Sequence, residues 1–119
     1  MNSLVYDNNN VFAKILREEL SCKKVYEDEQ ILAFEDKYPK APTHILVIPK
    51  GNYISFDDFI SSSSDDNMLH FFKVIRKIAC EHKLDKTGYK LITNHGEGGG
   101  QEIPHFHIHI LGGGGLRID

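Results

Sequence analysis

The stretch His105-Phe106-His107-Ile108-His109-Ile110-Leu111 carries a histidine at every second position, with an apolar residue after each one. Side chains of a β-strand alternate between the two faces of a sheet. A strand over residues 103–111 therefore places the three histidines on one face and leaves the apolar residues between them to be buried on the other. The pattern predicts a β-strand that presents a row of imidazoles to a polar site.

Two kinds of chemistry use such a row. Three imidazoles can bind zinc, but neighbours on one strand face stand about 7 Å apart, which is awkward for ligands that meet at about 2 Å on one ion. A neutral imidazole can instead attack phosphorus, provided that a hydrogen bond orients its other nitrogen. A strand without chemical function is the third interpretation, and the alternation with core residues makes it the weakest.

The segment before the histidines, residues 94–101, is rich in glycine. Glycine permits backbone conformations in which several N–H groups converge on an anion such as phosphate. The segment matches neither the Walker loop nor the dinucleotide fingerprint, whose last glycine is replaced here by Gln101. By itself the loop is therefore equally consistent with phosphate binding and with a flexible connection between strands.

Length and charge limit the classes of protein to consider. The chain has 119 residues, of which 40% are hydrophobic and 26% charged, so we expect a single domain over residues 1–119, with flexible tails at 1–9 and 114–119. The net charge of −3 argues against a surface that coats nucleic acid, which requires a basic patch. A local pocket for one small nucleotide remains compatible with this charge.

The distribution of cysteine and apolar residues indicates a cytoplasmic protein. Cys22 and Cys80 are far apart and form no CxxC pair, so we expect free thiols. No apolar run approaches the length that spans a membrane, and residues 1–10 lack the features of a signal peptide.

Periodicity predicts an α+β fold with an antiparallel sheet, because the connections are too short for many parallel crossovers. Helices are expected at residues 10–20, 56–60 and 68–83, the last after a polar loop that supplies its N-cap. Strands are expected at residues 24–27, 31–34, 44–48, 89–93 and 103–111. The apolar run at 44–48 is typical of a central strand covered on both faces.

The histidine stretch resembles the motif of the histidine triad (HIT) family, His-φ-His-φ-His-φ-φ, in which φ is apolar. Residues 41–50 resemble the family's second block, and residues 99–102 precede the histidines at the expected distance. Leu111-Gly112-Gly113 resembles the Hint branch, the nucleoside phosphoramidases. Over residues 11–113 the resemblance implies a HIT-like fold: a five-stranded antiparallel sheet with two main helices, which joins that of a second copy into a ten-stranded sheet.

The resemblance also implies residue roles. His107 would attack the α-phosphorus, His109 would contact the phosphate, and His105 would lie with His44 behind them to tune proton positions. Asp36 would bind the ribose, although a loop cap explains this residue as well. Phe12, Ile15 and Phe34 would line the base pocket, although a helix stripe or core accounts for Phe12 and Ile15 equally. The remaining nucleotide contacts implied are Asn94, Gly100, Gln101 and Glu102.

These roles predict a hydrolase that cleaves purine nucleoside phosphoramidates to nucleoside monophosphates through a nucleotidyl-histidine. No cofactor is expected, and zinc is not required. Open alternatives are a hydrolase of dinucleoside polyphosphates or adenylyl sulfate, a nucleotide-binding or scaffold module, and a zinc protein. Two positions depart from the family pattern: Glu102 stands where serine is common, and Lys37 replaces an apolar pocket residue.

Overall fold

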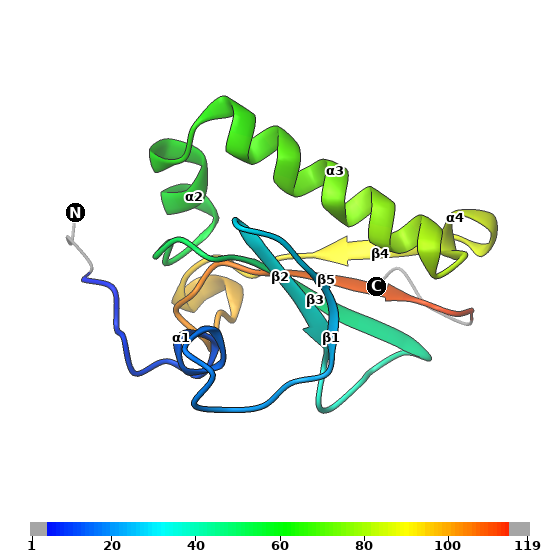
Figure 1. Ribbon diagram of the computed structural model, residues 1–119, viewed down its shortest axis with the longest axis horizontal. Coiled ribbons are helices and arrows are strands. Elements are labelled where there is room, and N and C mark those ends of the chain that lie inside the picture. The colour runs from blue at the N-terminus through cyan, green and yellow to red at the C-terminus, as the bar shows by residue number, and fades with distance from the viewer. Residues whose placement is uncertain (1–4, 115–119) are drawn as a thin grey trace.

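Five antiparallel strands form one sheet, as predicted, in a computed structural model that describes residues 5–114. The strand order is β1-β2-β3-β5-β4. Helices α2 and α3 lie over one face of the sheet and α1 lies on the other (Figure 1). The elements are α1 (Val11–Leu16), β1 (Lys24–Glu27), β2 (Ile31–Glu35), β3 (Thr43–Pro49), α2 (Phe56–Ser62), α3 (Asp65–Glu81), α4 (Leu84–Thr87), β4 (Tyr89–Ile92), the short 3₁₀ helix η1 (Glu97–Gly99) and β5 (Ile108–Gly112). No helix within residues 5–114 has the length and apolar character needed to cross a membrane.

Strand β3 is the central strand, and its apolar run is covered on both faces, as the sequence predicts. Ile45 and Val47 face α2 and α3, where they join the larger core cluster. Leu46 and Ile48 face α1 and pack with Phe12 in a second cluster. Because neighbouring residues of a strand point to opposite faces, His109 of β5 shares the α1 side with Leu46, with which it pairs.

Helix α3 begins where the polar loop predicts its cap. The Ser64 side chain accepts a hydrogen bond from the Asn67 N–H, and Asp65 and Asp66 lie in the first turn, where negative charge is favourable. The residues that α3 buries against the sheet recur at helical spacing: Phe71, Val74, Ile75, Ile78 and Ala79. The helix runs from residue 65 to 81, three residues earlier at its start than the apolar pattern alone indicates.

Two predicted boundaries were wrong by several residues. Strand β5 begins at Ile108 rather than at residue 103, because the His105 N–H turns back to the Ile103 carbonyl and leaves the ladder. Helix α1 ends at Leu16 rather than at residue 20, since the backbone takes a positive φ of 64° at Glu18. Helix α4 was not predicted. Of the tails predicted at 1–9 and 114–119, residues 1–4 and 115–119 lie outside the described part, and the tail prediction stays untested.

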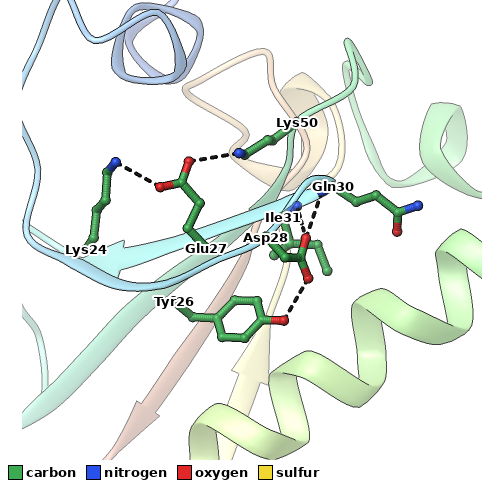
Figure 2. Close-up of polar contacts among 7 residues, drawn as sticks. All are labelled: Lys24, Tyr26, Glu27, Asp28, Gln30, Ile31 and Lys50. Carbon is green, nitrogen blue, oxygen red and sulfur yellow. Dashed lines mark hydrogen bonds and ion pairs between the residues drawn. The ribbon is translucent and has the colours of Figure 1, made fainter.

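The β1–β2 hairpin is held by the carboxylate of Asp28 (Figure 2). One oxygen accepts from the backbone N–H groups of Gln30 and Ile31, at 2.7 and 2.8 Å. The other accepts from the Tyr26 hydroxyl and from Nε2 of His70 on α3, both at 2.7 Å. Burial opposes ionisation of this group, but the hydrogen bonds outweigh it and lower the pKa of Asp28 to about 2. The cluster therefore ties the hairpin to α3.

Beside this turn, Glu27 lies between two lysines, Lys24 and Lys50, with 2.8 Å from each ammonium group to the carboxylate (Figure 2). Hydrogen bonds from both lysines lower the pKa of Glu27 to about 2. These pairs are exposed to solvent, and such pairs contribute little to stability.

Replacing Asp28 with asparagine is expected to lower the free energy of unfolding by about 1–2 kcal/mol at neutral pH, because hydrogen bonds to a charged acceptor are lost. The folded-state pKa is depressed, so the contribution of the carboxylate is complete above about pH 4 and disappears as the pH falls towards about 2. Urea unfolding at pH 7 and at pH 2.5 checks this: the difference between wild type and D28N should shrink at the lower pH. A difference that stays constant or grows would contradict it.

Candidate active site

His107 is held so that one ring nitrogen carries a proton and the other does not. Its Nδ1 lies 2.7 Å from the backbone carbonyl of His105, and a carbonyl only accepts, so Nδ1 donates. In the neutral imidazole the lone pair is then on Nε2. The backbone of the same residue is fixed by the Thr93 hydroxyl, which donates to its carbonyl at 2.8 Å. The ring of Phe12 meets the imidazole edge-on, with ring centroids 4.9 Å apart.

A second chain of hydrogen bonds orients His109. The backbone N–H of Lys40 donates to Nδ1 of His44 at 3.0 Å, so a neutral His44 carries its proton on Nε2. That nitrogen lies 2.9 Å from Nδ1 of His109, to which it donates. Neutral His109 therefore carries its own proton on Nε2. The rings of His107 and His109 are adjacent, with centroids 5.1 Å apart. The site therefore combines the lone pair on Nε2 of His107 with a hydrogen-bond donor, Nε2–H, on the neighbouring His109.

Burial keeps these imidazoles neutral. Desolvation lowers the pKa of His107 and of His44 below the ordinary value of 6.5, although the negative charge of Asp36 opposes the shift in both. Desolvation together with the neighbouring histidines lowers the pKa of His109 to about 4. At neutral pH the row is therefore a set of uncharged imidazoles whose tautomers are determined by their hydrogen bonds.

His105 lies beneath this row, with a ring that is fully buried. Its Nε2 donates to the Pro49 carbonyl at 2.8 Å, and its Nδ1 accepts from the hydroxyl of Tyr6. Desolvation lowers its pKa to about 4. The resemblance implies that His105 lies with His44. In the structure the two rings have different partners: His105 is held by Pro49 and Tyr6, and His44 contacts His109.

The carboxylate of Asp36 makes two contacts, one to the Tyr38 backbone and one to His44. One carboxylate oxygen accepts from the Tyr38 N–H at 2.8 Å, which is the loop cap weighed above. The other lies 3.3 Å from Nε2 of His44.

The predicted base-pocket residues Phe12 and Phe34 are buried in the cluster under α1, and Ile15 packs against it.

The glycine-rich loop is braced by its own polar groups. The Gln101 amide accepts from the Gly96 N–H and donates to the carbonyls of Ile54 and Ile103, so it is committed to backbone groups. Asn94 donates to the Gly99 carbonyl at 2.8 Å.

The sequence suggested that backbone N–H groups of this loop could bind an anion. Four of them, at residues 96, 99, 100 and 101, instead donate hydrogen bonds to other groups of the loop. Gly100 takes a φ of +78°, which explains a glycine there. Glu102, the next residue after the braced amide, is exposed.

Asp36, His44 and His109 each offer a ligand atom within 4.8 Å of the others, so this trio is where a cation could be held. The facing nitrogens of the two histidines already share a proton across 2.9 Å, however. Binding an ion through both of those nitrogens would break the bond that orients His109. The arrangement fits a hydrogen-bond relay better than a metal centre.

Three parts of the site escaped sequence reasoning: the Tyr6 hydroxyl, the Thr93 hydroxyl and the backbone N–H of Lys40. Tyr6 is 99 positions from the histidine that it contacts, and no local pattern marks it. Thr93 ends the predicted strand at 89–93, where a β-branched residue needs no functional explanation. The Lys40 contact is made by backbone, to which side-chain identity gives no signal.

Comparison with known proteins places this geometry in a family. Residues 17–115 match the model of the HIT domain. An uncharacterized HIT-like protein of Rickettsia prowazekii is 57% identical over 109 residues, covering 92% of this chain and 91% of that protein. A purine nucleoside phosphoramidase of Escherichia coli is 40% identical over 103 residues, with coverage of 87% and 86%.

Solved structures agree. A histidine triad protein from Clostridium difficile superposes with a TM-score of 0.82 at 44% identity, covering 95% of this chain and 97% of that one. A HIT family hydrolase from Legionella pneumophila has a TM-score of 0.83 at 38% identity, with coverage of 92% and 97%. The histidine row, the sheet that carries it and the matched length of the sequence lead to one conclusion: this chain is a member of the HIT domain family.

Proposed function

We propose that the chain hydrolyses purine nucleoside phosphoramidates, such as adenylated amines, to the nucleoside monophosphate through a covalent intermediate on His107. The observation that carries this proposal is the neutral His107 ring, whose Nδ1 donates to the His105 carbonyl while Nε2 keeps its lone pair. The related phosphoramidase of Escherichia coli supports the choice of the P–N bond.

The reaction would proceed in two displacements at phosphorus. In the first, Nε2 of His107 forms a bond to the α-phosphorus and the P–N bond breaks, with the leaving nitrogen taking a proton from solvent. The ring becomes cationic, and its Nδ1–H donates to the His105 carbonyl, which stabilises that charge. In the second, water attacks phosphorus and returns a proton to solvent, and Nε2 leaves with its electron pair. Throughout, Nε2–H of His109 would donate to a phosphate oxygen.

The nucleotide would lie between α1 and the glycine-rich loop. A carboxylate such as that of Asp36 can accept from two ribose hydroxyls, and the apolar cluster around Phe12 and Phe34 suits a base. We propose that Asn94 and Glu102 face the phosphate or the leaving group from the loop. Purine is favoured by the relative's name alone.

The test is hydrolysis of a fluorogenic adenosine phosphoramidate by the purified protein in the presence of a chelator, with mass spectrometry of the protein quenched during turnover. We expect release of AMP and a chain carrying one adenylyl group on the peptide that contains residues 105–109. Turnover that the chelator abolishes would contradict the mechanism. Tight AMP binding without turnover would identify a binding module, and faster cleavage of a dinucleoside polyphosphate would identify the alternative substrate class.

We also infer that the chain acts as a homodimer. Strand β4 lies at the edge of the sheet, where an extended backbone is available to pair with another chain. Leu91 of β4 pairs with Ile110 and so shares the face that α3 covers. Large apolar side chains are exposed on both elements: Leu69, Phe72, Tyr89 and Leu91, at 55%, 39%, 37% and 46%. Pairing two copies along β4 would cover them and make a ten-stranded sheet.

Replacing Leu91 with aspartate is expected to convert the dimer to a monomer, because two carboxylates would be buried at the interface without partners. Analytical ultracentrifugation at micromolar concentration measures the change. The matched control is Val11→Asp, because Val11 is also 46% exposed but lies at the start of α1. Equal masses for wild type and L91D would contradict this interface.

A further inference from the structure

The ring of His105 has no free nitrogen, and one of its two partners comes from a distant part of the chain. Its Nε2 donates to the Pro49 carbonyl, so Nδ1 must accept, and the hydroxyl of Tyr6 donates to it. The Tyr6 ring also meets the imidazole edge-on, with centroids 5.5 Å apart. Since the imidazole is fully buried, no solvent molecule competes for these positions.

Tyr6 is itself held in place by the turn that leads into α1. The Asp7 carbonyl accepts from the backbone and side-chain N–H groups of Asn10, at 3.2 and 2.8 Å. The Asn10 side chain in turn caps α1 by accepting from the Ala13 N–H. The guanidinium of Arg17, just past α1, donates to the Asn8 carbonyl at 2.7 Å. The segment is thus fastened to both ends of the helix.

The backbone of His105 links this contact to the reacting nitrogen. Its carbonyl accepts from Nδ1 of His107, which is the bond that leaves Nε2 of His107 unprotonated. Two hydrogen bonds therefore connect Tyr6 to His107 through His105: one from the Tyr6 hydroxyl to the His105 ring, and one from His107 Nδ1 to the His105 carbonyl. Displacement of a reacting group by even about 1 Å can slow an enzyme about a hundredfold.

We propose that Tyr6 is a positioning residue for the reaction at His107, acting through His105. The Pro49 carbonyl sets the His105 tautomer, the Tyr6 hydroxyl holds the ring through the remaining nitrogen, and the ring holds the carbonyl that orients His107. His105 then serves as a support whose nitrogens never touch the nucleotide. The inference rests on the proposed function for its kinetic consequence, but the hydrogen-bond chain itself can be tested without any substrate.

Tyr6→Phe is the sharpest test, because it removes the hydroxyl and keeps the ring against His105. Tyr26→Phe is the matched control: it also removes one hydroxyl that donates a single hydrogen bond, to Asp28, at a site outside the row of His105, His107 and His109. For an adenosine phosphoramidate we expect Y6F to lower kcat by about 3- to 10-fold, the range of one lost hydrogen bond, with KM within about twofold. Y26F should keep both constants.

Nitrogen NMR of the histidine side chains supplies the readout that does not depend on turnover. In wild type we expect a His105 with a proton on Nε2 and a hydrogen-bonded, unprotonated Nδ1. In Y6F the Nδ1 signal should move to the position of a nitrogen without a donor, and the Nδ1–H signal of His107 should shift with it. In Y26F both signals should stay unchanged.

The outcomes separate the two proposals. A wild type without turnover but with the expected NMR changes in Y6F would overturn the proposed function and leave the hydrogen-bond chain standing. Unchanged His105 and His107 signals in Y6F would overturn the role of Tyr6, whatever the activity. So would a kinetic effect confined to KM, or an equal loss of kcat in Y26F, since either result shows that Tyr6 does not act through the orientation of His107.

Discussion

Replacing His107 with alanine is expected to lower kcat for an adenosine phosphoramidate by about 10⁴-fold or more, the scale at which removal of a nucleophile or its base acts in covalent catalysis. The side chain is 7% exposed and supplies the lone pair on which both displacements depend. No other imidazole of the row is oriented to replace it: both nitrogens of His105 are occupied, and Nδ1 of His109 faces His44. Single-turnover kinetics with mass spectrometry measures both the rate and the covalent intermediate.

The control for this prediction is His82→Ala. His82 follows α3, its Nδ1 contacts the Ile78 carbonyl, and it takes no part in the row. We expect H82A to keep wild-type kcat and H107A to bind AMP with an affinity near that of wild type. A further check is His107→Gly with added imidazole, which should recover part of the activity because it returns the missing nitrogen. If H107A kept more than a tenth of the wild-type rate, His107 could not be the nucleophile.

The second large effect is on stability and concerns Phe106, which lies between His105 and His107 in the sequence. Phe106→Ala is expected to lower the free energy of unfolding by about 3–5 kcal/mol, a large part of the total for a domain of this size. Its ring is 1% exposed, stacks on Phe59 at 4.7 Å between centroids, and lies 5.4 Å from that of Phe71. The truncation would leave a cavity beside Phe59 and Phe71, because α2 and α3 hold these two rings in place. Urea unfolding monitored by circular dichroism measures the change.

Tyr38→Ala is the matched truncation on the surface, where the side chain is 73% exposed, and we expect it to change the free energy of unfolding by less than about 0.5 kcal/mol. Phe106→Leu keeps part of the volume and should lie between the two. Similar losses for F106A and Y38A would show that the aromatic cluster does not support β5.

Much of the fold could be predicted because burial in this protein follows simple periodicities. The unbroken apolar run in β3 indicated a central strand, and both of its faces are covered. The spacing in α3 indicated one buried face, and the polar loop before the helix indicated where its cap lies. Boundaries were less predictable, since they depend on single backbone conformations: the positive φ at Glu18 ends the turn after α1, and the bend at His105 delays β5.

Only part of the candidate site could be predicted from the sequence. Alternation in the sequence placed His107 and His109 on one face, because that needs only the geometry of an extended chain. Gln101 was expected at the phosphate, yet its amide braces the glycine-rich loop. For Asp36 the sequence allowed a ribose contact or a loop cap, and the structure shows the cap together with a contact to His44.

The sequence by itself therefore determined the family, the sheet with its two apolar faces and the row of histidines, since these follow from local spacing and composition. Only the tertiary structure decided which nitrogen of each histidine carries the proton. That choice is made by the groups that the fold places at the rings: the Pro49 carbonyl at His105, the His105 carbonyl at His107, and His44, itself oriented by the Lys40 N–H, at His109. A tautomer depends on what lies within 3 Å of each ring nitrogen, and folding alone brings those groups together.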